Sequence, residues 1–195
     1  MKCATIGHSN YPAERFLALL RKSGITDIVD VRSSPYSRAV PHFDRERLRP
    51  YLEANGIKYH YMGTSLGARN HDKELLFPDG RVDFSKVRER PAFISALSEV
   101  ISLIAEGKQV ALMCSEKEPY DCHRFVLISY ALQKKGIKVE HILEDGSRVP
   151  NSELEKRLKK EYAQRDLFSF NEAESASLDK LYERRNKAIA YRASE

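Results

Sequence analysis

Short apolar runs alternate with longer amphipathic segments through the first three quarters of the chain. Several of the short runs are rich in β-branched residues, which favours buried strands. Each longer segment ends next to a glycine, and several begin at proline or aspartate, as helices commonly do. The pattern predicts strands at residues 3–6, 25–31, 57–61, 110–113 and 137–143, and helices at residues 12–23, 44–55, 91–107 and 122–135.

This alternation predicts an α/β fold with a mostly parallel five-stranded sheet and helices on both of its faces. We expect an α/β core domain over residues 1–149 and a helical C-terminal extension over residues 150–195, packed on the core or tethered to it. Capping boxes that start at Ser152 and Asn171 predict two helices in the extension, separated by residues 164–170. Residues 63–83 have no clear period and are predicted to form a long loop.

The composition is ordinary for a packed globular protein. Of the 195 residues, 42% are apolar and 31% are charged, with a formal net charge of +5. No apolar run approaches the length of a membrane helix, and the first residues lack a secretory signal. Three cysteines cannot form a closed disulfide framework. We therefore expect a cytoplasmic protein without a membrane partner, whose positive charge favours an anionic small molecule or a nucleic acid as its partner.

Polar residues gather where the predicted strands end, which is where parallel sheets bind their ligands. The first strand is followed by His8 and Ser9. In the second strand, Asp30 and Arg32 share one face, and a buried carboxylate needs a partner such as this guanidinium. A structural ion pair and a simple turn are the alternatives to a binding site. Three further polar side chains follow: Tyr36, Ser37 and Arg38.

The segment between the fourth strand and the helix after it is the densest in reactive groups. These groups are Cys114, Glu116, Lys117, Cys122, His123 and Arg124. The predicted helix start exposes N–H groups and the positive end of the helix dipole, which attract anions and lower the pKa of a thiol. A cysteine that closes a buried strand is also a common small core residue.

Three kinds of chemistry fit this segment. Metal binding by Cys114, Cys122 and His123 is disfavoured, because neighbouring residues of a helix point about 100° apart and the paired-cysteine spacing of zinc sites is missing. Thiol chemistry at either cysteine stays open, although no C-x-x-C motif is present. The third is acid–base or nucleophilic work by Glu116, Asp30 or His8, with an anion held by Arg32, Lys117 and Arg124. We expect no metal, and no cofactor, since no glycine-rich nucleotide motif occurs.

Three segments in the same order resemble the signature blocks of the bacterial and archaeal "domain of unknown function 488" family. They are Thr5–Ser9, Asp30–Arg38, and Cys114–Lys117 followed by Cys122–Arg124. The resemblance covers residues 2–146. It implies a cytoplasmic α/β domain whose signature residues are those just named, and it brings no reaction with it, so the function must be argued from chemistry.

A second resemblance lies in the tail. The sequence Gln-Arg-Asp-Leu-Phe at residues 164–168 is similar to the pentapeptide by which bacterial repair and replication proteins dock on the sliding clamp. In such a peptide Leu167 and Phe168 would fill an apolar pocket while Gln164 supplies hydrogen bonds. The alternative is that the two apolar residues anchor the C-terminal segment to the sheet.

The leading hypothesis is an enzyme that acts on a phosphate-bearing nucleotide or nucleic acid at the carboxyl edge of the sheet, with a link to DNA repair or replication. Hydrolytic or glycosidic-bond chemistry is favoured over redox chemistry. The alternatives are a thiol-dependent redox or sulfur-transfer enzyme and a non-enzymatic nucleic-acid and clamp adaptor. The expected catalytic residues are His8, Asp30, Cys114 and Glu116. The expected substrate-binding residues are Ser9, Arg32, Tyr36, Ser37, Arg38, Lys117, Cys122, His123 and Arg124.

Overall fold

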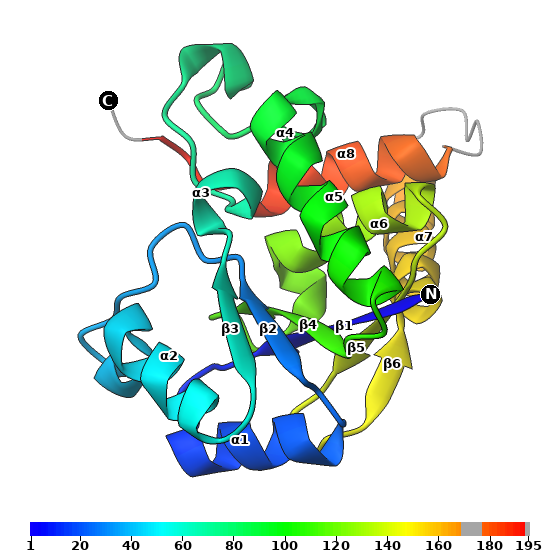
Figure 1. Ribbon diagram of the computed structural model, residues 1–195. Coiled ribbons are helices and arrows are strands. Elements are labelled where there is room, and N and C mark those ends of the chain that lie inside the picture. Colours follow the sequence, from blue (N-terminus) through cyan, green and yellow to red (C-terminus); the bar gives the residue numbers. More distant parts are fainter. Residues whose placement is uncertain (169–176, 194–195) are drawn as a thin grey trace.

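A six-stranded sheet forms the centre of the protein (Figure 1). The computed structural model describes residues 1–168 and 177–193, with side chains up to residue 163 and from residue 177 onward. The strand order is β3-β2-β4-β1-β5-β6, and all neighbours pair in parallel except β5 and β6. The strands are β1 (Lys2–Gly7), β2 (Asp27–Asp30), β3 (Lys58–Tyr61), β4 (Val110–Cys114), β5 (Lys138–Ile142) and β6 (Arg148–Pro150). The α/β class and the mostly parallel sheet are confirmed.

The count of five strands is corrected to six by the short edge strand β6. Its three residues are too few to show a period, so the sequence pattern could not reveal it. The chain turns back at Gly146, which has a φ of +79°, and Leu143 accepts a hydrogen bond from the glycine N–H at 3.0 Å. Pro150 ends the strand at the sheet edge, where its missing N–H costs no ladder bond.

The direction of each crossover decides which face of the sheet a helix covers. Crossovers between parallel strands are right-handed, so those that run towards β3 and those that run towards β5 place their helices on opposite faces. Figure 1 shows the first group below the sheet and the second above it. The first group is α1 (Ala13–Lys22) and α2 (Arg45–Ala54); the second is α5 (Pro91–Ala105), the π-helix η4 (Arg124–Ser129) and α6 (Tyr130–Lys134).

Each face of the sheet has its own apolar core, because successive strand residues point to opposite sides. In β2, Ile28 packs with the helices of the lower face, whereas Val29 packs with those of the upper face. Phe16 of α1 and Phe93 of α5 are buried in the two cores. Burying such a side chain stabilises the fold by about 1.5–3 kcal/mol.

The segment predicted as a long loop contains short ordered pieces. A bridge between Leu76 and Val82 closes its second half. The helix after it was not predicted, and its first turn is capped by the Asp83 carboxylate, which accepts a hydrogen bond from the Ser85 N–H at 2.9 Å. The short helices are η1 (Pro41–Phe43), α3 (Gly63–Leu66), η2 (Lys73–Leu75), α4 (Phe84–Glu89) and η3 (Pro119–Asp121).

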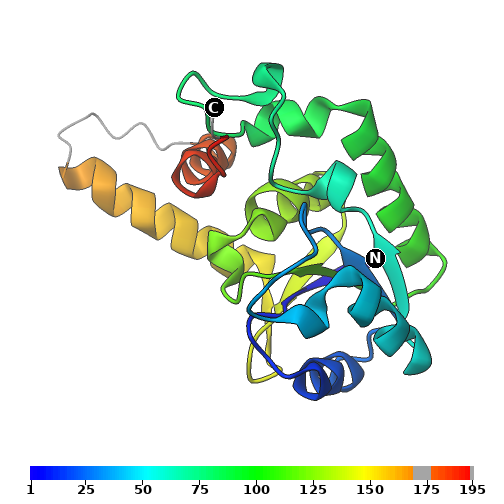
Figure 2. The ribbon, with the colours of Figure 1, turned by 90° about the vertical axis from the view of Figure 1, so that its left-hand side faces the viewer.

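The C-terminal extension contains α7 (Asn151–Phe168) and α8 (Leu178–Ile189). Figure 2 shows α7 extending away from the sheet. The predicted separator over residues 164–170 is wrong as far as Phe168, because α7 continues through that residue. The side chains of Gln164, Leu167 and Phe168 and the predicted helix start at Asn171 lie outside the described residues, so the clamp peptide stays a hypothesis. Of the helices within the described ranges, none is both long and apolar enough to cross a membrane.

A buried histidine in β5 makes the stability of this fold sensitive to acid. His141 lies between Thr5 and Asn151, with hydrogen bonds of 2.8 and 2.9 Å, and burial lowers its pKa from 6.5 to about 4. The unfolded chain therefore binds more protons than the native protein between these values, so the stability falls as the pH drops from 6.5 to about 4. The expected loss is on the order of 3 kcal/mol.

Urea unfolding at neutral pH and at the acid end of this range gives the total acid loss, and the difference from a variant without this ring measures the contribution of His141. His141→Gln removes the titrating ring but keeps an amide that can reach Asn151, so its stability should depend less on pH by the same amount. An equal acid sensitivity in the variant and in the natural protein would contradict the assignment.

Candidate functional site

A cleft of about 350 Å³ opens at the carboxyl ends of β2 and β4. The chain leaves β2 and β4 towards opposite faces of the sheet, and this change of direction creates a crevice where parallel sheets place ligands. The cleft is lined by Arg32, Ser33, Ser34, Ala68, Arg69, Phe84, Cys114, Ser115, Glu116, Asp121, Cys122, His123, Ile189 and Tyr191. Five sequence-predicted site residues thus share one cavity: Arg32, Cys114, Glu116, Cys122 and His123.

Arg32 is held by a buried network at the end of β2. Its Nε donates to both carboxylate oxygens of Asp30, at 2.9 and 3.1 Å, and its Nη2 donates to one of them at 2.6 Å. The Tyr59 hydroxyl donates to the same carboxylate at 2.5 Å. Asp30 is fully buried and Arg32 is 5% exposed. The ion pair that was left open as an alternative therefore exists, and Asp30 lies behind Arg32 rather than along the cleft.

His8 completes this network from the end of β1. Its Nε2 lies 3.0 Å from Nη1 of Arg32, and its Nδ1 donates to the Ser9 carbonyl at 2.7 Å. Because an arginine can only donate, Nε2 is the acceptor and the ring is neutral. Burial, with help from the positive charge of Arg32, lowers the pKa of His8 to about 4. The ring also stacks on Phe43, so His8 orients Arg32 instead of facing the cleft.

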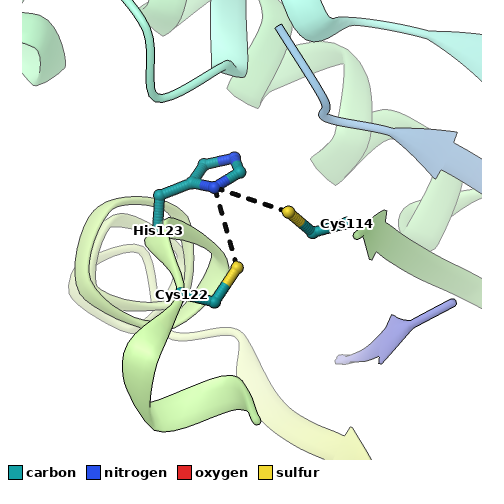
Figure 3. A group of neighbouring side chains, drawn as sticks. All are labelled: Cys114, Cys122 and His123. Carbon is teal, nitrogen blue, oxygen red and sulfur yellow. Dashed lines mark hydrogen bonds between the residues drawn. The ribbon is translucent and has the colours of Figure 1, made fainter. Parts of the chain in front are cut away.

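Two cysteines and a histidine converge on the cleft (Figure 3). Nδ1 of His123 lies 3.7 Å from the sulfur of Cys114 and 3.7 Å from the sulfur of Cys122. The three candidate ligand atoms all lie within 4.8 Å of one another. The helical placement of residues 122 and 123 that disfavoured their convergence is wrong for Cys122, which has extended backbone (φ −125°, ψ 146°) and precedes the helix.

A backbone hydrogen bond shows that Nε2, the other ring nitrogen of His123, carries a proton. Nε2 lies 3.1 Å from the carbonyl oxygen of Val31, which can only accept, so Nε2 carries the proton. Nδ1, the other ring nitrogen, faces the two sulfur atoms. All three side chains are buried and both thiols are free.

The two thiols differ in their affinity for a proton. A hydrogen bond from Cys122, together with His123 and the positive charge of Arg124, holds the pKa of the Cys114 thiol well below its usual value. Burial is the main reason that the pKa of Cys122 is raised well above it. Of the two thiols, Cys114 therefore loses its proton more readily.

Arg124 shapes the loop after β4 from inside the protein. It is 1% exposed and its Nη2 donates to the Lys117 carbonyl at 2.9 Å, while Nη1 donates to the Glu116 carbonyl at 2.5 Å. The predicted anion-binding role for Arg124 is not reflected in this placement, since its guanidinium holds the loop. The exposed side chain of Glu116 is thereby kept on the cleft.

The remaining predicted residues do not line the cleft. Lys117 pairs with Glu144, and the Tyr36 hydroxyl donates to Glu46 at 2.8 Å. Among the described non-glycine residues, Ser9 alone has a positive φ, of 49°. Its N–H donates to the Ser115 carbonyl, so Ser9 serves as a turn residue. Two others lie in the loop between β2 and α2, outside the cleft lining: Ser37 and Arg38.

Sequence reasoning missed the outer wall of the cleft, which comes from two distant segments. Arg69 follows α3, and its guanidinium lies 5.2 Å from the centre of the Tyr191 ring beyond α8. The Arg69 N–H donates to the Ser33 hydroxyl at 3.0 Å. A Cβ on Gly67 would lie 2.2 Å from that hydroxyl, so this close approach requires a glycine. The glycine was the one available signal, since neither segment has a periodic pattern.

The fold and the cleft define an α/β protein with a mostly parallel sheet and a thiol–imidazole cluster at the carboxyl ends of its parallel strands. The chain belongs to the family described as Domain of unknown function DUF488, whose model matches residues 12–131. The sequence resemblance to this family is therefore confirmed. Comparison with curated proteins and with solved structures gave no match.

Proposed function

We propose that this protein is an enzyme whose active site is the cleft at the carboxyl ends of β2 and β4, and that its substrate is a phosphate-bearing nucleotide or nucleic acid. The observation that carries the proposal is the meeting of an exposed carboxylate, Glu116, with the buried cluster of Cys114, Cys122 and His123 in one cavity. Catalytic sites combine such acid–base groups with polar groups that share a cavity.

An anionic substrate is favoured by the groups at the cleft and around it. The charge of Arg32 is neutralised by Asp30. Arg69 also lines the cleft, and its side chain is exposed to solvent, so it is the cation that can bind an anionic substrate. Hydroxyls of Ser33, Ser34 and Ser115 can donate hydrogen bonds to phosphate oxygens. Tyr191, with Arg69 over its ring, offers a surface on which a base can stack.

A binding experiment tests the substrate class. Nucleoside monophosphates and a short single-stranded oligonucleotide are titrated into the full chain, with Kd measured by calorimetry. Arg69→Ala should weaken binding about tenfold or more, which corresponds to about 1.4 kcal/mol. Arg21→Ala removes the same charge on α1, where the guanidinium binds Asn55, and should leave Kd unchanged. Equal effects of the two substitutions, or no binding by the natural chain, would overturn the anionic substrate.

The enzymatic role is tested separately on the ligands that bind. Products are followed by chromatography for release of base or phosphate, because hydrolytic and glycosidic-bond chemistry suit a carboxylate general acid or base. Glu116→Gln keeps the shape of the side chain and should lower kcat by about 10²-fold or more while Kd changes little. Turnover that survives this substitution would exclude Glu116 from the chemistry.

A further inference from the structure

The cluster of Cys114, Cys122 and His123 has the composition and spacing of a metal site. A tetrahedral zinc ion with Zn–S of about 2.3 Å and Zn–N of about 2.0–2.1 Å separates its sulfur and nitrogen ligands by about 3.6 Å. The two sulfur–nitrogen distances here are 3.7 Å each. All three atoms lie within 4.8 Å of one another, so side-chain movement can bring both sulfur atoms and the nitrogen onto one ion.

The surroundings of His123 match those of a metal ligand. Metal-bound histidines almost always donate their second ring N–H to a carbonyl or carboxylate, which fixes the tautomer and aims the free nitrogen at the ion. The Val31 carbonyl accepts this bond from Nε2 at 3.1 Å. Nδ1 then faces the two sulfur atoms, as Figure 3 shows.

The chemistry of the three groups selects the metal. Two thiolates and an imidazole favour zinc over magnesium or calcium, which prefer oxygen ligands. Structural zinc sites are closed by four protein ligands, whereas catalytic sites have three and leave a position for water or substrate. Within the described residues the cluster supplies three ligands, and all three line the cleft.

We propose that Cys114, Cys122 and His123 bind one zinc ion whose fourth coordination position faces the cleft. This proposal departs from the expectation, made from the sequence, that the protein binds no metal. Water bound at such a position ionises near neutral pH, and Glu116 lines the same cavity. As a statement about catalysis this inference rests on the proposed function, but the metal site itself does not depend on the substrate.

Metal analysis of the full chain tests the site. The protein, purified under reducing conditions and incubated with zinc, should retain about one ion per chain after gel filtration. Cys114→Ser, Cys122→Ser and His123→Gln should each weaken zinc binding more than about tenfold in competition with a chelator. Cys3→Ser is the matched control, because Cys3 is equally buried but lies at the other end of β1, and it should bind zinc like the natural protein.

Cobalt binding and thiol alkylation are measured on the natural chain, so they test the site even if a variant fails to fold. The cobalt-loaded natural chain should show a sulfur-to-cobalt charge-transfer band and the strong visible bands of tetrahedral coordination. In the natural chain, zinc should also slow alkylation of Cys114 and Cys122, located by mass spectrometry, and leave that of Cys3 unchanged. Equal labelling with and without zinc, or a cobalt spectrum without the sulfur band, would overturn the site and favour free thiol chemistry.

The two proposals fail in different ways. A chain that binds nucleotides through Arg69 but retains no metal keeps the proposed active site and loses the zinc. A chain that retains about one zinc ion but binds no phosphate-bearing ligand keeps the metal centre and loses the substrate class.

Discussion

Replacing Asp30 with alanine is expected to lower the free energy of unfolding by about 3–5 kcal/mol. The substitution leaves the Arg32 guanidinium buried without its counter-ion, and it also removes the acceptor of the Tyr59 hydroxyl. Total stabilities of about 5–15 kcal/mol make this a large fraction. Urea unfolding would show a lower midpoint with an unchanged slope, and Tm should fall by roughly 6–20 °C.

Two further variants separate the causes. Glu53→Ala breaks the surface pair with Arg49, whose side chains are 62% and 44% exposed, and should cost about 0.5 kcal/mol or less. Combining Asp30→Ala with Arg32→Met removes the unpaired charge and should restore part of the loss. If Asp30→Ala cost no more than Glu53→Ala, the buried pair would not stabilise the sheet edge as described.

Gly7→Ala is the second substitution with a large expected effect, about 3 kcal/mol of lost stability. A Cβ at this position would lie 1.9 Å from the carbonyl oxygen of Glu116 and 2.7 Å from Nη1 of Arg124. The loop that carries Glu116 must then move, and Arg124 loses its hydrogen bonds to the carbonyls of this loop. Because Gly7 also pairs with Cys114 across the sheet, the cleft floor should shift too.

Gly107→Ala serves as its control. Gly107 has a φ of +84° and open space around its Cβ position, so alanine there costs only backbone strain of roughly 1 kcal/mol. Chemical unfolding measures the free energy of unfolding of both variants. It thereby compares the cost of steric overlap at residue 7 with the cost of backbone strain at residue 107. A smaller loss for Gly7→Ala than for Gly107→Ala would contradict the close approach of β1 to the loop after β4.

The strands could be predicted where periodicity reports burial. Val110 to Met113 is uniformly apolar and forms the buried part of β4, next to the strand that ends at Asp30. The residues at these two carboxyl ends therefore had to meet, and this is why Arg32, Cys114 and Glu116 were found from sequence. No periodic signal describes β6 or the segment that carries Arg69, because each depends on contacts with distant parts of the chain.

The convergence of Cys114, Cys122 and His123 was disfavoured from the sequence for a local reason. Treating Cys122 and His123 as one helical turn directs their side chains apart, but Cys122 has extended backbone and lies before the helix. The π-helix that follows is equally invisible in the pattern, and in it the Arg124 carbonyl accepts a bond from the Ser129 hydroxyl at 2.6 Å. Such helical irregularities occur frequently at functional sites.

The contact between α8 and the segment just before Cys122 limits how far this chain can be shortened. Arg185 of α8 pairs with Asp121 and lies 4.0 Å from the Tyr120 ring, so the neighbour of Cys122 is braced by a segment near the C-terminus. The family match ends at residue 131 and begins after β1, which is a central strand. A chain shortened to the matched residues would lack both the central strand β1 and the support that α8 gives to Asp121, and during synthesis the cluster gains that support only after α8 has left the ribosome.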